Sequence, residues 1–195
     1  MKNRMKHFIV VLFLVVVAGC ASAPSRFYTL NSTATGDGAA SSNVAVIVGP
    51  VSIPAEVDRP QFTVQVAPNR VAVDEFNRWA APLSDNIARV VAGNLAVLLG
   101  TPRVATLPAA TFKSAYGVTL SVQRFESVPG KSVLVDVVWV VRQPSGGSTL
   151  SGRTIANEPV SGDSFDELAA AHSRALAKVS RDIAAAIRAE ADLKP

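Results

Sequence analysis

The apolar positions of this 195-residue chain follow two periods, which divide it into strand-like and helix-like segments. Alternation with period two predicts strands at 61–66, 116–126 and 132–142, because every second side chain of a strand points to the same face. Apolar residues spaced three and four apart predict a helix over 82–98 and a longer final helix that begins after Ser164. Shorter apolar runs predict further strands at 27–30, 44–48, 71–73, 103–107 and 149–155.

The order of these segments predicts one α+β domain, in which an antiparallel-rich β-sheet carries two packed α-helices. Short turns at 128–131 and 144–147 join the three strands between 116 and 155, which indicates an antiparallel meander. The middle strand is apolar on both faces apart from Asp136, so we expect it to be central and covered on much of both faces. Ser164 and Glu167, three residues apart, predict a capping box at the start of the last helix.

The stretch 31–43 contains only Asn, Ser, Thr, Ala, Gly and one Asp, and it offers no large apolar side chain to a core. Such a composition predicts a mobile loop after the first strand. The alternative is that everything up to Asn43 is one long linker.

The N-terminus has the order of a secretory signal peptide. Three basic residues precede the uncharged apolar stretch 8–18, which is too short for a bilayer core that needs about 20 residues. The sequence Val17-Ala18-Gly19-Cys20 then resembles the lipobox of bacterial lipoproteins, in which the signal is cut before a cysteine that receives a diacylglycerol and an N-acyl chain. We predict a cleaved signal at 1–19, an acylated tether at 20–26 and a single α+β domain at 27–195. The alternatives are a transmembrane N-terminus or a chance cysteine in an ordinary signal.

Removal of the signal changes the charge of the protein. The whole chain carries 19 Lys and Arg against 15 Asp and Glu, a formal charge of +4. Three of these bases and none of the acids lie in residues 1–19, so the mature chain has a net charge of +1. A clustered basic face is absent from the sequence, which argues against nucleic acid as a partner.

Candidate catalytic residues are few. His172 is the only histidine after the signal, and the only cysteine is the predicted acylation site, Cys20. His172 lies on the apolar stripe of the last helix, where we expect a partly buried side chain with one hydrogen bond. The sequence thus predicts no enzyme, no metal site and no cofactor besides the covalent lipid.

Two segments are candidates for partner binding. Residues 53–60 combine three charges with two prolines and form either a recognition loop or a stiff connector between strands. Arg78-Trp79, just before the first helix, is either an exposed anchor or a tryptophan tucked under the helix start with its N–H bonded.

Several of these fragments, taken in order, resemble the PqiC (paraquat-inducible protein C) family, also called ABC-type transport auxiliary lipoproteins. The resemblance rests on Phe27-Tyr28-Thr29-Leu30 shortly after the lipobox, Val48-Gly49-Pro50-Val51-Ser52-Ile53-Pro54, Val57-Asp58-Arg59-Pro60-Gln61, Arg78-Trp79-Ala80-Ala81-Pro82-Leu83 and Asn94-Leu95. The candidate partner-binding residues within it are Pro54, Asp58, Arg59, Pro60, Arg78 and Trp79.

The resemblance implies a lipoprotein of the outer membrane that faces the periplasm and has no catalytic activity. In that family it accompanies an MCE-domain (mammalian cell entry) tunnel protein and an inner-membrane component, which move lipids between membranes and maintain envelope integrity. It also implies a ring-like homo-oligomer that receives the distal end of the tunnel. The alternatives are an envelope scaffold that binds peptidoglycan or an assembly machine, and a lipid-anchored hydrolase.

Overall fold

The structure is a computed structural model that describes residues 23–36, 38, 42–108, 112, 114–147 and 149–192. The predicted signal peptide and Cys20 lie outside these residues. The elements in chain order are β1 (Arg26–Tyr28), β2 (Val46–Ser52), β3 (Gln61–Ala67), β4 (Arg70–Trp79), α2 (Leu83–Leu99), β5 (Val104–Thr106), β6 (Tyr116–Val128), β7 (Ser132–Arg142), a 3₁₀ turn (Pro144–Gly146), β8 (Thr149–Pro159) and α3 (Phe165–Asp192).

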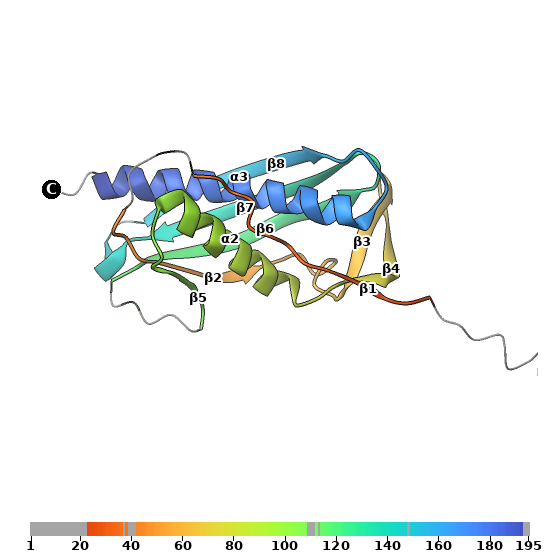
Figure 1. Ribbon diagram of the computed structural model, residues 1–195, viewed down its shortest axis with the longest axis horizontal. Coiled ribbons are helices and arrows are strands. Elements are labelled where there is room, and N and C mark those ends of the chain that lie inside the picture. The colour runs from red at the N-terminus through yellow and green to blue at the C-terminus, as the bar shows by residue number, and fades with distance from the viewer. Residues whose placement is uncertain are drawn as a thin grey trace, which may run out of the picture.

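These elements form a single α+β domain with mostly antiparallel strands, which confirms the predicted fold class. The strands form two sheets, whereas the sequence pattern suggested one. The main sheet has the strand order β5-β2-β6-β7-β8, and the end sheet has the order β1-β4-β3. Figure 1 shows the end sheet at one end of the elongated molecule and the C-terminus of α3 at the other. Three pairings are parallel (β1 with β4, β2 with β5 and β2 with β6) and join segments far apart in the sequence.

The meander β6-β7-β8 is confirmed, with antiparallel pairing along nearly the whole of β7. The side chains of Val133, Val135, Val137 and Val141 are fully buried. This face of the main sheet packs against α3. The other face of β7 is only half-buried apart from Asp136. β7 is therefore internal, as predicted, but helices cover only one of its faces.

Both helices begin where the sequence indicates, and α2 also ends there. Gly100 adopts a left-handed conformation with φ of 61° and ends α2, a backbone angle that glycine tolerates best. The Glu167 N–H donates to Ser164 Oγ at 3.2 Å at the start of α3, which is the bond that a capping box requires.

The segment after β1 contacts both helices. The N–H groups of Thr33 and Ala34 donate to Asn94 Oδ1 on α2, each at 3.0 Å, and the Asn31 N–H donates to Ser173 Oγ on α3 at 3.1 Å. The prediction of a mobile loop is therefore wrong for residues 31–34. Its error was to count only apolar side chains, since backbone N–H groups can also be held by buried polar side chains.

Several strands extend past their predicted ends, and the extensions of β2 and β4 matter for the site. β2 continues past Pro50 to Ser52, and its pairing with β6 shifts between Val48 and Val51. This irregularity accommodates a proline, which has no N–H to donate to a ladder. β4 continues to Trp79 and brings that residue beside β1.

Candidate partner-binding groove

A groove lies where the end of β4 meets the connector between β2 and β3. Its volume is about 410 Å³, and it is lined by Asp58, Arg59 and Pro60 of the connector and by residues 79–83. The backbone N–H of Trp79 donates to the Pro60 carbonyl oxygen at 2.6 Å, and this hydrogen bond joins the two walls of the groove. The Ala80 N–H donates to the Tyr28 carbonyl at 2.9 Å, so β1 also holds this corner.

Beneath the groove lies a cluster of aromatic rings. The Trp79 side chain is only 5% exposed, and its ring stacks on Phe62 with centroids 4.0 Å apart. Phe62 in turn meets Tyr28 and Phe165 edge-on, at centroid distances of 5.5 and 5.1 Å. Aromatic pairs of this kind stabilise by about 0.5–1.5 kcal/mol each beyond the area they bury. The floor of the groove is therefore well packed.

The walls combine a small charged rim with apolar surface. Asp58, Arg59 and Pro60 are exposed, as are residues 80–82 opposite them, while Leu83 is buried. The lining residues include one carboxylate and one guanidinium, and none of them carries a hydroxyl, thiol or imidazole. Such a site is suited to holding an apolar side chain of a partner while the rim contacts polar groups around it.

The structure brings together four of the six residues that the sequence nominated. Pro54 starts the connector, where its carbonyl accepts the Val57 N–H at 3.1 Å, and it does not line the groove. Arg78 points to the opposite face of β4 from Trp79, and its Nε donates to the Glu75 carbonyl at 3.0 Å. The idea of Trp79 as an exposed anchor is wrong, because the residue is buried beside the start of α2.

Residues 80–83 also line the groove, although the sequence did not single them out as part of a site. They stand directly after Trp79 in the same motif, so their position next to a nominated residue was the available signal. The sequence did not reveal that this motif would face residues 58–60.

His172 lies close to this floor but does not reach the groove. It is fully buried, its ring stacks on Phe125 with centroids 3.8 Å apart, and its Nε2 shares a hydrogen bond of 2.8 Å with Ser127 Oγ. Among the described residues, Nδ1 has no hydrogen-bond partner. Burial lowers the pKa of His172 to about 3, so the imidazole is neutral at physiological pH. The expectation of one hydrogen bond was right, but the side chain is more buried than expected.

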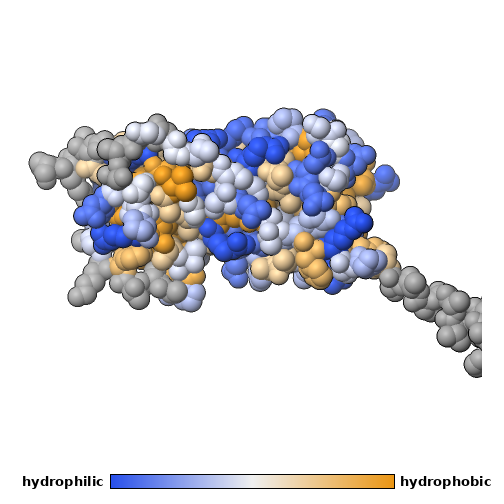
Figure 2. Space-filling view, in the orientation of Figure 1, coloured by the Kyte–Doolittle hydropathy of each residue, from blue (hydrophilic) through white to orange (hydrophobic). Residues whose placement is uncertain are grey.

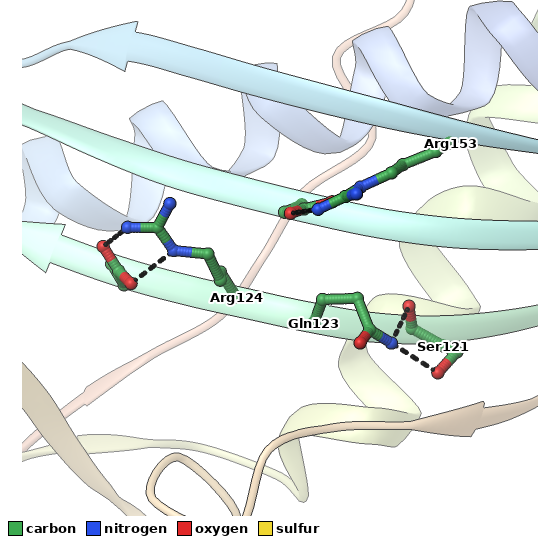
Figure 3. A network of polar contacts seen from close by, with 6 residues as sticks. Ser121, Gln123, Arg124 and Arg153 are labelled. Carbon is green, nitrogen blue, oxygen red and sulfur yellow. Dashed lines mark hydrogen bonds and ion pairs between the residues drawn. The ribbon is translucent and has the colours of Figure 1, made fainter.

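A second surface is the helix-free face of β6, β7 and β8, which we call the open face. Arg153 makes a bidentate pair with Asp136, with Nε–Oδ1 and Nη2–Oδ2 distances of 2.8 and 2.6 Å, and Arg124 pairs similarly with Glu126 (Figure 3). The hydrogen bonds from Arg153 lower the pKa of Asp136, although burial opposes this shift. Asp136 is therefore a buried carboxylate whose charge is matched from the neighbouring strand.

The open face is also partly apolar. Leu134, Val138 and Val140 are half-buried there, and Ile155, which pairs with Asp136 on β8, is 61% exposed. Arginine is one of the residue types enriched at contacts between proteins.

Neither a metal centre nor a membrane span is found in the part of the chain that the structure describes. Within it, no three His, Cys, Asp or Glu side chains gather closely enough to hold a metal ion. None of its helices is both long and apolar enough to cross a bilayer.

Two solved structures share this fold. The crystal structure of an uncharacterized protein matches with a TM-score of 0.69 at 16% identity and covers 85% of this chain and 99% of that chain. A Xanthomonas campestris protein assigned to the family DUF330 matches with a TM-score of 0.65 at 20% identity, covering 81% and 92% of the two chains. The PelC dodecamer of Paraburkholderia phytofirmans has a TM-score of only 0.39 at 17% identity, and the match covers 76% of this chain and 88% of the PelC chain. At these identities the first two matches show the fold alone, and the third is too weak for any inference.

Sequence comparison adds the family. A search of curated proteins found no match to the chain. Residues 28–184 match the family model described as the ABC-type transport auxiliary lipoprotein component.

Proposed function

Since the chain belongs to the family of ABC-type transport auxiliary lipoproteins, we propose that it is the outer-membrane docking subunit of an intermembrane lipid transport system. In this proposal Cys20 carries the lipid anchor, the domain faces the periplasm, and the groove receives an MCE-domain tunnel protein. The protein binds and positions its partner without catalysing a reaction, and so supports the integrity of the envelope.

The single observation that carries the docking role is the groove between the connector and the end of β4. Two motifs about twenty residues apart, nominated from the sequence as partner-binding segments, supply its opposite walls. The groove has a buried aromatic floor and a rim of one acid and one base. An apolar floor with a charged rim is the usual composition of the centre of a protein–protein contact.

The anchor is supported by the N-terminal sequence and by the start of the fold. Only five residues, 21–25, separate Cys20 from the beginning of β1. Fully extended, a segment of this length reaches at most about 20 Å. A lipid on Cys20 would therefore hold the domain close to its membrane, where it could meet a conduit that crosses the periplasm.

A homo-oligomer is part of the same proposal, and the open face is the surface that we assign to contacts between copies. It combines half-buried aliphatic residues with the Asp136–Arg153 pair. A ring of copies built through this face would leave the groove, on another part of the molecule, available to the tunnel protein.

The docking role can be tested by filling the groove. Ala81 is an exposed residue of its wall, so Ala81→Trp adds bulk without disturbing the core. We expect this variant to be exported and acylated normally, to lose co-purification of the MCE-domain protein, and to make cells as sensitive to detergent as the deletion. Ala185→Trp is the matched control, because Ala185 is equally an exposed alanine but lies on α3.

Two results would contradict the proposal. Normal co-purification of the MCE-domain protein with Ala81→Trp would remove the groove from the docking role. Co-sedimentation with peptidoglycan in place of an MCE-domain protein would favour an envelope scaffold.

The role of the anchor can be tested separately with Cys20→Ala directed to the periplasm. We expect this variant to behave like the deletion, because the domain is no longer concentrated at the membrane. Full function from the soluble form would exclude the anchor from the mechanism.

A further inference from the structure

The end sheet concentrates exposed apolar side chains. Of the eight large hydrophobic residues that are exposed in the described part of the chain, five lie on its three strands. Their exposed fractions are 65% for Phe27, 48% for Val66, 56% for Val71, 37% for Val73 and 46% for Phe76. Soluble monomers seldom gather apolar side chains in this way, and such a patch commonly marks a contact with a protein or a membrane.

The strand register places several of these residues on one face. Tyr28 pairs with Trp79 and points into the core, so Phe27 and its partner Arg78 point outwards. On the other side of β4, Val71 and Val73 pair with Gln65 and Thr63, the positions of β3 that alternate with its buried residues. We call this surface, from Phe27 at one edge to Val71 near the hairpin turn, the outer face of the end sheet.

Hydrogen bonds fix the backbone around the exposed Phe76. Asp74 Oδ1 accepts hydrogen bonds from the Phe76 N–H at 2.9 Å and the Asn77 N–H at 2.8 Å, and Tyr28 Oη donates to Asn77 Oδ1 at 2.8 Å. These bonds fix the irregularity in β4 that separates its two stretches of pairing with β3. The backbone around this exposed aromatic side chain is thus well defined.

The length of chain before the end sheet indicates what covers its outer face. β1 is both the first strand of the end sheet and the element that begins six residues after Cys20. If Cys20 is acylated, as proposed above, the end sheet lies within about 20 Å of the lipid surface. The C-terminus of α3 lies at the other end of the molecule, since 28 residues of helix extend about 42 Å (Figure 1).

The charges at this end fit a lipid surface. Arg26 and Arg70 are exposed at the ends of β1 and β4, and Arg78 lies half-buried next to Phe27. Arg78 pairs with Glu75, with Nη2–Oε2 at 3.8 Å, and Glu56 and Glu126 line a hollow beside Val71 together with Arg70. Apolar side chains accompanied by arginines suit the boundary between headgroups and acyl chains. In the space-filling view, hydrophobic and hydrophilic atoms are mixed at the end of the molecule that carries β1 and β4 (Figure 2).

We infer that the outer face of the end sheet rests on the membrane that holds the acylated cysteine, with Phe27, Val71 and Val73 at the level of the lipid headgroups. The contact fixes the orientation of the domain, so that its long axis points away from the bilayer. It rests on the lipid anchor of the proposed function, but it concerns a surface that the anchor alone does not require.

The test uses full-length acylated protein in vesicles of phosphatidylethanolamine and phosphatidylglycerol. Val71→Cys or Val73→Cys supplies a thiol for an environment-sensitive fluorophore, since Cys20 is blocked by its lipid. Val71 stands seven residues along β4 from Arg78, roughly 20 Å from the anchored edge, so its label reaches lipid only if the sheet lies on the membrane. Val97→Cys on α2 and Leu107→Cys just after β5 are the controls, because both residues are exposed but lie outside the end sheet and outside the open face.

We expect the labels at Val71 and Val73 to shift to shorter emission wavelengths and to be quenched by lipids with nitroxide-labelled chains. The two control labels should keep the emission that they have in water. If all four labels behave like the controls while the protein floats with the vesicles, the inference is wrong and the anchor remains. A blue shift without quenching by lipid would also overturn it, because protein would then cover the face. If the protein fails to float at all, the anchor itself fails, and the inference fails with it.

Discussion

The buried pair of His172 and Ser127 makes the stability of this domain sensitive to acid. In the folded chain burial lowers the pKa of His172 to about 3, whereas an unfolded histidine has a pKa of about 6.5. At a pH between these two values the imidazole binds a proton in the unfolded chain but not in the folded one. The free energy of unfolding therefore falls as the pH falls. Between about pH 7 and about pH 4 this one residue should remove about 3 kcal/mol from the free energy of unfolding.

The perturbation that tests this reasoning replaces both partners, His172→Leu together with Ser127→Ala. Replacing both members of a buried hydrogen bond by apolar groups of similar shape is close to neutral in stability. The double variant should therefore resemble the wild type near pH 7 and become the more stable protein near pH 4. Other groups that titrate are common to both proteins, so their contributions cancel in the difference.

Urea unfolding at several pH values provides the measurement, with tryptophan fluorescence as the signal because Trp79 and Trp139 are both buried. Ser127→Ala alone is the control: it leaves the imidazole buried without its partner, should cost about 1–3 kcal/mol, and should keep the acid sensitivity. An equal loss of stability with acid in the wild type and the double variant would refute the assignment to His172.

Two further predictions concern the main sheet and can be checked by the same unfolding assay. A Cβ on Gly152 would lie 2.3 Å from Cζ2 of Trp139, so Gly152→Ala should cost about 1–3 kcal/mol through overpacking; Gly36→Ala, where nothing lies within 4 Å, should leave the midpoint unchanged. Arg153→Ala removes the bidentate partner of Asp136, whose side chain is only 3% exposed, and should cost about 1–3 kcal/mol near neutral pH. Because Arg153 lowers the pKa of Asp136, this cost should shrink once the pH falls below about 4, where the unfolded carboxyl is protonated. Unchanged stability of Arg153→Ala near pH 7 would contradict this account of the pair.

The sequence was a good guide wherever structure depends on near neighbours along the chain. Alternating valines in β7 predicted a strand, and Ser164 with Glu167 predicted the start of α3. Gly100 predicted the end of α2 because a left-handed residue there favours glycine. Each of these signals lies within a few residues of the feature that it predicts.

The candidate site was only half predictable. Residues 58–60 and Trp79 were nominated separately, and the sequence left open whether either segment bound a partner or merely connected strands. Their meeting depends on the hydrogen bond from the Trp79 N–H to the Pro60 carbonyl and on the packing of Trp79 against Phe62. The binding of residues 31–34 by Asn94 was missed for the same reason, because the partner lies about sixty residues away.

The sequence by itself therefore determined the helices and the meander, and it predicts the lipid anchor at Cys20. Only the tertiary structure decided that the strands divide into two sheets, that β1 pairs with β4, and that one face of the main sheet and one face of the end sheet stay uncovered. The physical reason is that periodicity records which side of an element is apolar, whereas the layer that covers that side is chosen by contacts between distant segments.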